Sequence, residues 1–204
     1  MHEVLTFLEN QSTLELLGLI FGLLAVILLI VEHITTWPAG IAYVIVSLPI
    51  FWEAKLYQDF ILHIFFGVMN VYGWVRWAKG KNVEETLHIG LMNGRQYLIV
   101  CFVSVAGILL SGYFFDTYTD TDFAYPDATT TILSFVAMWL TAEKKFENWI
   151  LWLVVDIVAS IIYFMKGLYP YFLLYLIYCG LAFGGMINWW RLYKTQTNKQ
   201  VSPY

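Results

Sequence analysis

Long apolar runs recur along the whole chain, and they limit its fold more than any other feature of the sequence. A helix that crosses the hydrocarbon core of a bilayer needs about 20 predominantly apolar residues. Seven runs approach that length: 14–31, 34–52, 60–77, 97–115, 125–142, 149–165 and 169–190. The fifth run is the weakest, because three consecutive threonines dilute its start. We therefore predict an all-α integral membrane protein, with seven transmembrane helices in a single transmembrane domain, 1–204.

Composition favours the same fold class. Hydrophobic residues make up 60% of the chain and charged residues only 13%, whereas a soluble domain carries about 25% charged residues. The net charge of −4 and the scattered basic residues also argue against a nucleic-acid partner. Cys101 and Cys179 both fall inside apolar runs, so we expect small core residues rather than a disulfide or a metal site.

The basic residues predict the orientation of the chain in the membrane. Cytoplasmic loops of membrane proteins carry an excess of Lys and Arg. With a cytoplasmic C-terminus, only Lys55 and Lys166 fall outside. The inside then receives Arg76, Lys79, Lys81, Arg95, Lys144, Lys145, Arg191, Lys194 and Lys199. Since the number of spans is odd, the N-terminus is predicted to lie outside.

An internal repeat relates two parts of the chain. A shift of 112 positions lays residues 37–77 on residues 149–189 without a gap and produces ten identical pairs. Identical aliphatic pairs are common in so apolar a chain. The informative pairs are Trp37/Trp149, Leu56/Leu168, Tyr57/Tyr169, Gly73/Gly185 and Trp77/Trp189. Chance similarity between two apolar hairpins is the alternative explanation.

Extended to the first span, the repeat predicts two three-helix units. They cover 14–77 and 125–190, with a linker helix at 97–115 between them and a cytoplasmic tail at 191–204. Four helices separate equivalent elements, so both units should have the same orientation in the membrane. Parallel repeats are a transporter architecture, with the substrate held near the midplane between the repeats.

Polar side chains at membrane depth are the default candidates for a functional site. Helical spacing gives three faces: His63, Gly67, Asn70 and Trp74; Asn148, Trp152 and Asp156; and Tyr171, Tyr175 and Tyr178. Less specific explanations stay open for most of them. His63 and Asn70 would also serve to bond a neighbouring helix, and Tyr171 would also serve as an interfacial anchor.

Asp156 is the most informative of these residues. A carboxylate near the centre of a transmembrane helix is unfavourable by roughly 2.5–3.5 kcal/mol on insertion scales. It would be tolerated if it is protonated, pairs with His63, or faces a cationic substrate. Aromatic residues make up 19% of the chain, and aromatic walls suit a flat cationic ring.

With these residues in view, the chain resembles the PnuC family of bacterial vitamin transporters over roughly residues 14–191. The resemblance rests on Leu56-Tyr57, on Asn70-Val71-Tyr72-Gly73-Trp74-Val75-Arg76-Trp77, and on Glu147-Asn148-Trp149-Ile150-Leu151-Trp152 leading into Asp156. Gly185 and Trp189 match the closing helix of the family.

The resemblance implies a 3+1+3 facilitator of the bacterial inner membrane, similar in shape to the SWEET sugar facilitators. Members move a dephosphorylated vitamin down its gradient, and a cytoplasmic kinase traps the product, so no cofactor is expected. The nicotinamide riboside branch has Asn at the place of Asp156, Gln at that of His63 and Asn at that of Tyr43. The buried Asp and the short chain resemble the thiamine-type branch (PnuT) more closely. Thiamine is therefore the expected substrate, with nicotinamide riboside, itself a pyridinium cation, as the alternative.

The expected partners are thus the vitamin and the lipid bilayer, with a homo-oligomer left open. The residues expected to bind substrate are Asp156, Asn148, Trp152, Asn70, Trp74, His63, Tyr43, Tyr175, Trp52 and Glu32.

Two other protein classes have features in common with this sequence. A retinal protein needs a Lys inside its last helix, and the run 169–190 contains none, because Lys166 precedes it. A membrane enzyme would use Asp156 and His63 as acid and base. No metal-ligand spacing, nucleophile motif or sizeable soluble domain accompanies that pair, so we do not expect an enzyme.

Overall fold

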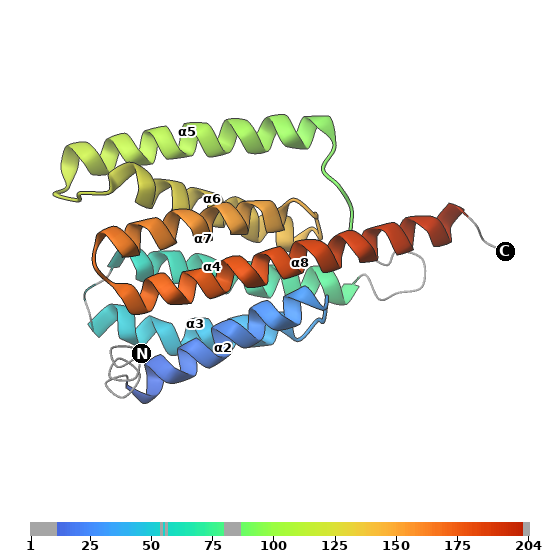
Figure 1. Ribbon diagram of the computed structural model, residues 1–204, viewed down its shortest axis with the longest axis horizontal. Coiled ribbons are helices and arrows are strands. Elements are labelled where there is room, and N and C mark those ends of the chain that lie inside the picture. The colour runs from blue at the N-terminus through green and yellow to red at the C-terminus, as the bar shows by residue number, and fades with distance from the viewer. Residues whose placement is uncertain (1–11, 54, 56, 80–86, 202–204) are drawn as a thin grey trace. The chain divides into compact units, whose positions relative to one another are not determined.

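A computed structural model of the chain describes residues 12–53, 55, 57–79 and 87–201. Leu56, which belongs to the internal repeat, and the basic residue Lys81 lie outside these residues. The described part forms seven helices and no strand: α2 (Thr13–Ile30), α3 (Thr36–Glu53), α4 (Tyr57–Lys79), α5 (Gly94–Tyr118), α6 (Ala124–Ala142), α7 (Asn148–Met165) and α8 (Tyr169–Val201) (Figure 1). Each predicted span coincides with one helix, so the predicted all-helical fold is confirmed.

Four of these helices are long and apolar enough to cross a membrane by length and composition alone. Within the described ranges they are α2, α5, α7 and α8. The other three are less apolar, and each carries polar groups or proline: α3 contains Pro49, and α6 begins with the run of threonines. Thr129 and Thr130 donate their hydroxyls to the carbonyls of Tyr125 and Asp127. Because these hydroxyls are satisfied by the helix backbone, α6 remains helical despite the diluted pattern.

Helix α8 extends well past the predicted end of the seventh span. It continues from Tyr169 to Val201, so most of the segment expected as a tail is helical. In Figure 1 the C-terminal half of α8 projects beyond the ends of α6 and α7. The helix leaves the apolar pattern at Arg191 but keeps its backbone hydrogen bonds.

The chain divides into two compact units, Met1–Leu87 and His88–Tyr204. In the first unit α3 packs against both α2 and α4. Helix α2 begins at a capping box, in which Ser12 and Glu15 each accept a hydrogen bond from the other's backbone N–H. The Thr36 hydroxyl joins the start of α3 to α2 by donating to the Ala25 carbonyl at 2.7 Å.

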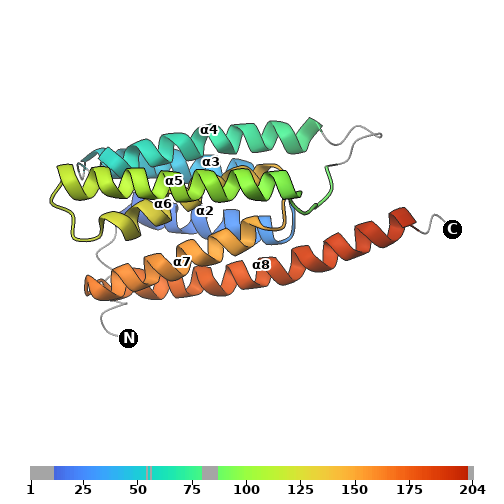
Figure 2. The same ribbon diagram turned by 90° about the horizontal axis from the view of Figure 1, so that it is seen from above.

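The second unit packs its helices in chain order. Helix α6 contacts α5 and α7, and α7 contacts α8 (Figure 2). The predicted linker helix, α5, is therefore part of this compact unit. The parallel 3+1+3 arrangement of the two units stays a prediction.

The hairpin α3–α4 and the hairpin α7–α8 correspond at the same shift of 112 residues. Thr36–Glu53 shifted by 112 becomes Asn148–Met165, which are the bounds of α3 and α7. The backbone turns correspond as well. Glu32 (φ 57°) matches Lys144 (φ 50°) before these helices, and Lys55 (φ 58°) matches Gly167 (φ 70°) after them. Left-handed conformations are rare for residues other than glycine, so this agreement is far more specific than shared apolarity.

A tryptophan–glycine contact closes each hairpin in the same way. Trp37 packs edge to face on Trp77, with ring centroids 5.2 Å apart, and Trp149 packs likewise on Trp189 at 5.7 Å. Trp37 and Trp149 are each only 1% exposed. Gly73 and Gly185 let these rings approach, since a Cβ on either would lie 2.2 Å or 2.4 Å from a ring carbon. The repeat thus includes identical core packing.

The segment before α5 docks onto the α6–α7 turn. Gly90 exchanges backbone hydrogen bonds with Lys144 and Phe146, and the buried carboxylate of Glu147 accepts from the Met92 N–H at 2.9 Å. The same Glu147 oxygen accepts from the Tyr97 hydroxyl at 2.5 Å. This Glu147 clamp ties α5, α6 and α7 together at one end of the second unit.

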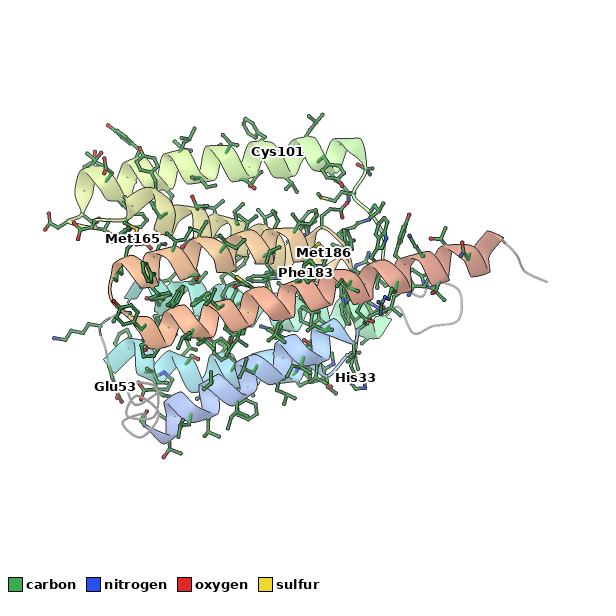
Figure 3. All side chains as sticks on the ribbon, in the orientation of Figure 1. His33, Glu53, Cys101, Met165, Phe183 and Met186 are labelled. Atoms are coloured by element: carbon green, nitrogen blue, oxygen red, sulfur yellow. The ribbon has the colours of Figure 1, made fainter. Side chains whose placement is uncertain are left out.

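One prediction about the core is wrong. Cys101 is exposed on α5, as Figure 3 shows, and Cys179 on α8 is half-buried. Helix α5 exposes one long apolar face, which includes Leu98, Phe102 and Leu110. An apolar run in a membrane protein does not distinguish the core from the lipid-facing surface, because both are apolar.

Candidate functional site

His63 is the centre of a buried polar group in the first unit. It lies on α4 and is 6% exposed. Its Nδ1 is 2.7 Å from the Asp59 carbonyl oxygen, and its Nε2 is 3.1 Å from the Tyr43 hydroxyl on α3. Because a carbonyl only accepts, Nδ1 carries the proton. The neutral ring then accepts at Nε2 from Tyr43. The structure thus joins two predicted site residues directly.

Aromatic rings enclose His63. The Phe51 ring is 4.4 Å from the imidazole, centroid to centroid, and the Phe66 ring is 5.7 Å away. Both imidazole nitrogens have partners inside this unit. His63 therefore needs no hydrogen bond to Asp156. That pairing was one of the three explanations for the buried carboxylate.

Asn70 lies on the same face of α4 as His63, seven residues further along the chain, and is also buried. Its amide donates to the Phe66 carbonyl at 2.8 Å. Gly40 on α3 makes room for this side chain, since a Cβ on Gly40 would lie 2.1 Å from Asn70 Oδ1. Asn70 therefore fills a gap between α3 and α4, the helix-bonding role that the sequence left open.

The other candidates of the first unit do not join this group. Trp74 is 43% exposed and Trp52 is 59% exposed. Trp52 contacts the Phe60 ring near the α3–α4 turn, with centroids 5.4 Å apart. Glu32 occupies the left-handed position of the α2–α3 turn. The positions of Trp52 and Glu32 agree with their location at the ends of the predicted spans.

Asn148 and Trp152 meet at a residue that sequence reasoning missed. Thr141, at the end of α6, accepts a hydrogen bond from Trp152 Nε1 at 3.2 Å. The Thr141 hydroxyl lies 3.3 Å from Asn148 Oδ1, and Asn148 Nδ2 donates to the Lys145 carbonyl at 2.6 Å. Asn148 is fully buried. The amide of Asn148 thus holds the α6–α7 turn, and the Thr141 hydroxyl fixes the indole of Trp152. The repeat offered no signal for Thr141, because its counterpart is Leu29.

Asp156 is buried on α7, with 8% of its surface exposed. No hydrogen bond or ion pair to its carboxylate forms within the part of the chain that the structure describes. The Cys179 thiol on α8 lies within its electrostatic range. An unpaired buried carboxylate either holds a proton or faces a cation. Of all predicted residues, Asp156 has the clearest capacity to bind a ligand.

Tyr175 belongs to a cluster of tyrosines between α7 and α8. Its ring stacks on Tyr163 of α7 with centroids 5.2 Å apart and an interplanar angle of 26°. Tyr163 follows Asp156 by seven residues and therefore lies on the same face of α7. That spacing was visible in the sequence, yet it was missed because Tyr163 lies near the end of the span.

The described residues contain no group of three or more His, Cys, Asp or Glu side chains that would hold a metal ion. The candidate residues of the second unit offer amide and hydroxyl groups, aromatic rings and the carboxylate of Asp156. Such a set suits a flat organic cation.

Comparison with known proteins identifies the family. The sequence model described as nicotinamide mononucleotide transporter matches residues 12–191. The nicotinamide riboside transporter PnuC of Escherichia coli (strain K12) is 27% identical over 205 residues, which cover 88% of this chain and 86% of that protein. The riboflavin/roseoflavin transporter RibM of Streptomyces davaonensis is 25% identical over 179 residues, which cover 86% and 84%.

A solved structure has the same fold. The crystal structure of the vitamin B3 transporter PnuC superimposes with a TM-score of 0.74 and 24% sequence identity, and the match covers 94% of this chain and 86% of that one. The chain therefore belongs to the nicotinamide mononucleotide transporter (PnuC) family, and it is a multi-pass membrane transporter of a vitamin rather than an enzyme.

Proposed function

We propose that this protein facilitates the uptake of a dephosphorylated B vitamin with a cationic aromatic ring, and that nicotinamide riboside is the first candidate. The observation that carries the proposal is Asp156, a buried carboxylate without a partner among the described residues. A pyridinium ring compensates the loss of hydration of such a carboxylate, and Trp152 and Tyr163 on the same face of α7 favour a flat cation.

The relatives support this choice over the thiamine expectation. Proteins from Escherichia coli and Neisseria mucosa, 27% and 26% identical, carry the name nicotinamide riboside transporter. The RibM relative is named for riboflavin and roseoflavin. None of these names contains thiamine.

Thiamine is the second candidate, and the chemistry of Asp156 is what favours it. The thiazolium ring of thiamine is a cation like pyridinium. The resemblance described above implies Asn in place of Asp156 in the nicotinamide riboside branch. The carboxylate of Asp156 is therefore the residue difference that favours thiamine over nicotinamide riboside.

We propose an orientation with the N-terminus outside and the C-terminus in the cytoplasm. In the second unit the basic residues Lys144, Lys145, Arg191 and Lys194 lie at the end that holds the Glu147 clamp and the exit of α8. Lys166 lies at the opposite end, above the Phe123 ring. This distribution agrees with the positive-inside rule.

Ligand binding tests the substrate. Quenching of tryptophan fluorescence in the purified protein gives the Kd for nicotinamide riboside, thiamine, riboflavin and reduced nicotinamide riboside. The reduced form keeps the shape of nicotinamide riboside but has no ring charge. We expect Asp156→Asn to weaken binding of the cation about 10- to 100-fold, or about 1.4–2.8 kcal/mol, and binding of the reduced form much less.

Asp120→Asn is the matched control, because it makes the same chemical change on an exposed loop residue. Equal affinity of the parent and Asp156→Asn for both cationic vitamins would refute the ion-pair proposal.

Transport itself is measured in proteoliposomes. Facilitated diffusion predicts equilibration that is independent of proton and sodium gradients, whereas accumulation without a kinase contradicts it.

A further inference from the structure

Four tyrosines of the second unit form a continuous series of ring contacts. Tyr163 on α7 stacks with Tyr171 (5.3 Å, 24°) and with Tyr175 (5.2 Å, 26°), both on α8. Tyr175 in turn contacts the edge of Tyr178 at 5.8 Å. We call Tyr171, Tyr163, Tyr175 and Tyr178 the tyrosine ladder. Interplanar angles of 24° and 26° make both contacts of Tyr163 stacked ones.

The ladder connects the α7–α8 turn with the level of Asp156. Tyr171 is the third residue of α8 and is 38% exposed. Tyr178 immediately precedes Cys179, the residue within electrostatic range of the Asp156 carboxylate. Seven residues of helix separate Tyr171 from Tyr178, a rise of about 10 Å.

The ladder lies away from the exposed aliphatic residues of both helices. On α7 the exposed aliphatic residues are Ile150, Val154, Ile157 and Ile161. On α8 they are Leu173, Leu176, Ile177 and Ile187. At 100° per residue, these positions point away from Asp156 and Tyr163 on α7 and from the three ladder tyrosines on α8. The interfacial-anchor explanation does not account for a stack on the side opposite the exposed aliphatic residues.

The first unit has only part of this series. At the equivalent positions, Phe51 contacts His63 and His63 contacts Phe66. The place of Tyr171 is taken by Asp59, so the series of rings ends there. Core packing common to both units therefore explains the inner contacts, but it does not explain the extension to Tyr171.

We propose that the tyrosine ladder is an entry path, along which a flat cationic ring moves from the α7–α8 end of the second unit to Asp156. The inference rests on the proposed function. Each tyrosine face attracts a cationic ring weakly. Several weak positions in series favour movement, because a ligand must be able both to enter and to leave each one.

The test separates the rate of uptake from equilibrium affinity. Tyr163→Leu removes the central ring, while Tyr163→Phe keeps it. In proteoliposomes with nicotinamide riboside or thiamine, we expect Tyr163→Leu to lower the initial uptake rate about 5- to 10-fold and Tyr163→Phe to keep at least about half of it. The Kd of Tyr163→Leu in detergent should stay within about twofold of the parent value.

Tyr169→Leu is the matched control. Tyr169 is on the same helix but is 48% exposed and contacts Phe164 outside the ladder, so its uptake rate should equal that of the parent. Parent-like uptake by Tyr163→Leu, or a Kd that rises in proportion to the loss of rate, overturns the entry path and leaves the proposed function intact. Failure of the parent protein to transport either cation overturns both.

Discussion

The α3–α4 and α7–α8 hairpins are built on the same frame but have different interiors. Both use the same helix bounds, the same left-handed turn positions and the same Trp–Gly contact. Even a peripheral pair is shared: Trp52 and Phe60 lie 5.4 Å apart, and their counterparts Phe164 and Phe172 lie 5.3 Å apart. The frame is therefore determined by packing that tolerates little change.

The interiors differ by complementary exchanges. Where the first hairpin pairs Gly40 with Asn70, the second has Trp152 and Ala182 at the same positions. The larger side chain has moved from one helix to the other, and the indole of Trp152 is also much larger than the amide of Asn70. At this place the first unit has the polar amide of Asn70, whereas the second unit has the indole of Trp152. The comparison shows how one frame presents two chemically different surfaces.

The largest effect is expected at the shared Trp–Gly contact. Gly73→Ala and Gly185→Ala should each lower stability by about 3 kcal/mol, because a Cβ would overlap a buried indole ring that has no room to shift. Gly184→Ala is the control, since a Cβ there meets nothing within 4 Å. Thermal unfolding followed by size-exclusion chromatography in detergent measures all three. If Gly184→Ala lowers stability as much as Gly185→Ala, the loss of a glycine itself is responsible, and the Trp–Gly contact is not.

The Glu147 clamp should have the next largest effect, and it distinguishes the two units. Glu147→Ala leaves the Met92 N–H without its acceptor, and we expect a loss of about 2 kcal/mol. Tyr97→Phe removes only one donor and should lose about 1 kcal/mol. The counterpart of Glu147 is Thr35, whose hydroxyl contacts His33 at an exposed turn. Thr35→Ala should be nearly neutral, and an equally large loss there would mean that both turns depend on a clamp.

The contact between Gly40 and Asn70 should have the smallest effect on stability. This effect is best measured as the coupling free energy of a double-mutant cycle. Gly40→Ala alone places a Cβ against Asn70 Oδ1 and should lose about 1–2 kcal/mol. Asn70→Ala removes the obstructing group. The double variant should therefore be more stable than the sum of the single losses predicts, by about 1 kcal/mol. Additive losses in the thermal unfolding series would show that Asn70 does not fill the gap beside Gly40.

Part of the candidate site could be predicted from the sequence. Helical spacing correctly placed His63 with Asn70, and Asn148 with Trp152, because a shared face depends only on local helix geometry. Spacing did not predict that the amides of Asn148 and Asn70 would form hydrogen bonds within their own units. Both amides donate to backbone carbonyls, which carry no sequence signal.

The sequence by itself determined the helices and the repeat of the hairpins. Apolar runs dictate helices in a membrane, where every backbone polar group must bond within its own segment, and tryptophan and glycine at fixed spacing mark one repeated contact. Only the tertiary structure decided which polar groups are satisfied and which remain unpaired. Tyr43 meets His63 and Thr141 meets Trp152 across different helices, whereas Asp156 meets no such partner within the described chain. Hydrogen bonds between helices depend on rotation and distance, which apolar periodicity does not specify.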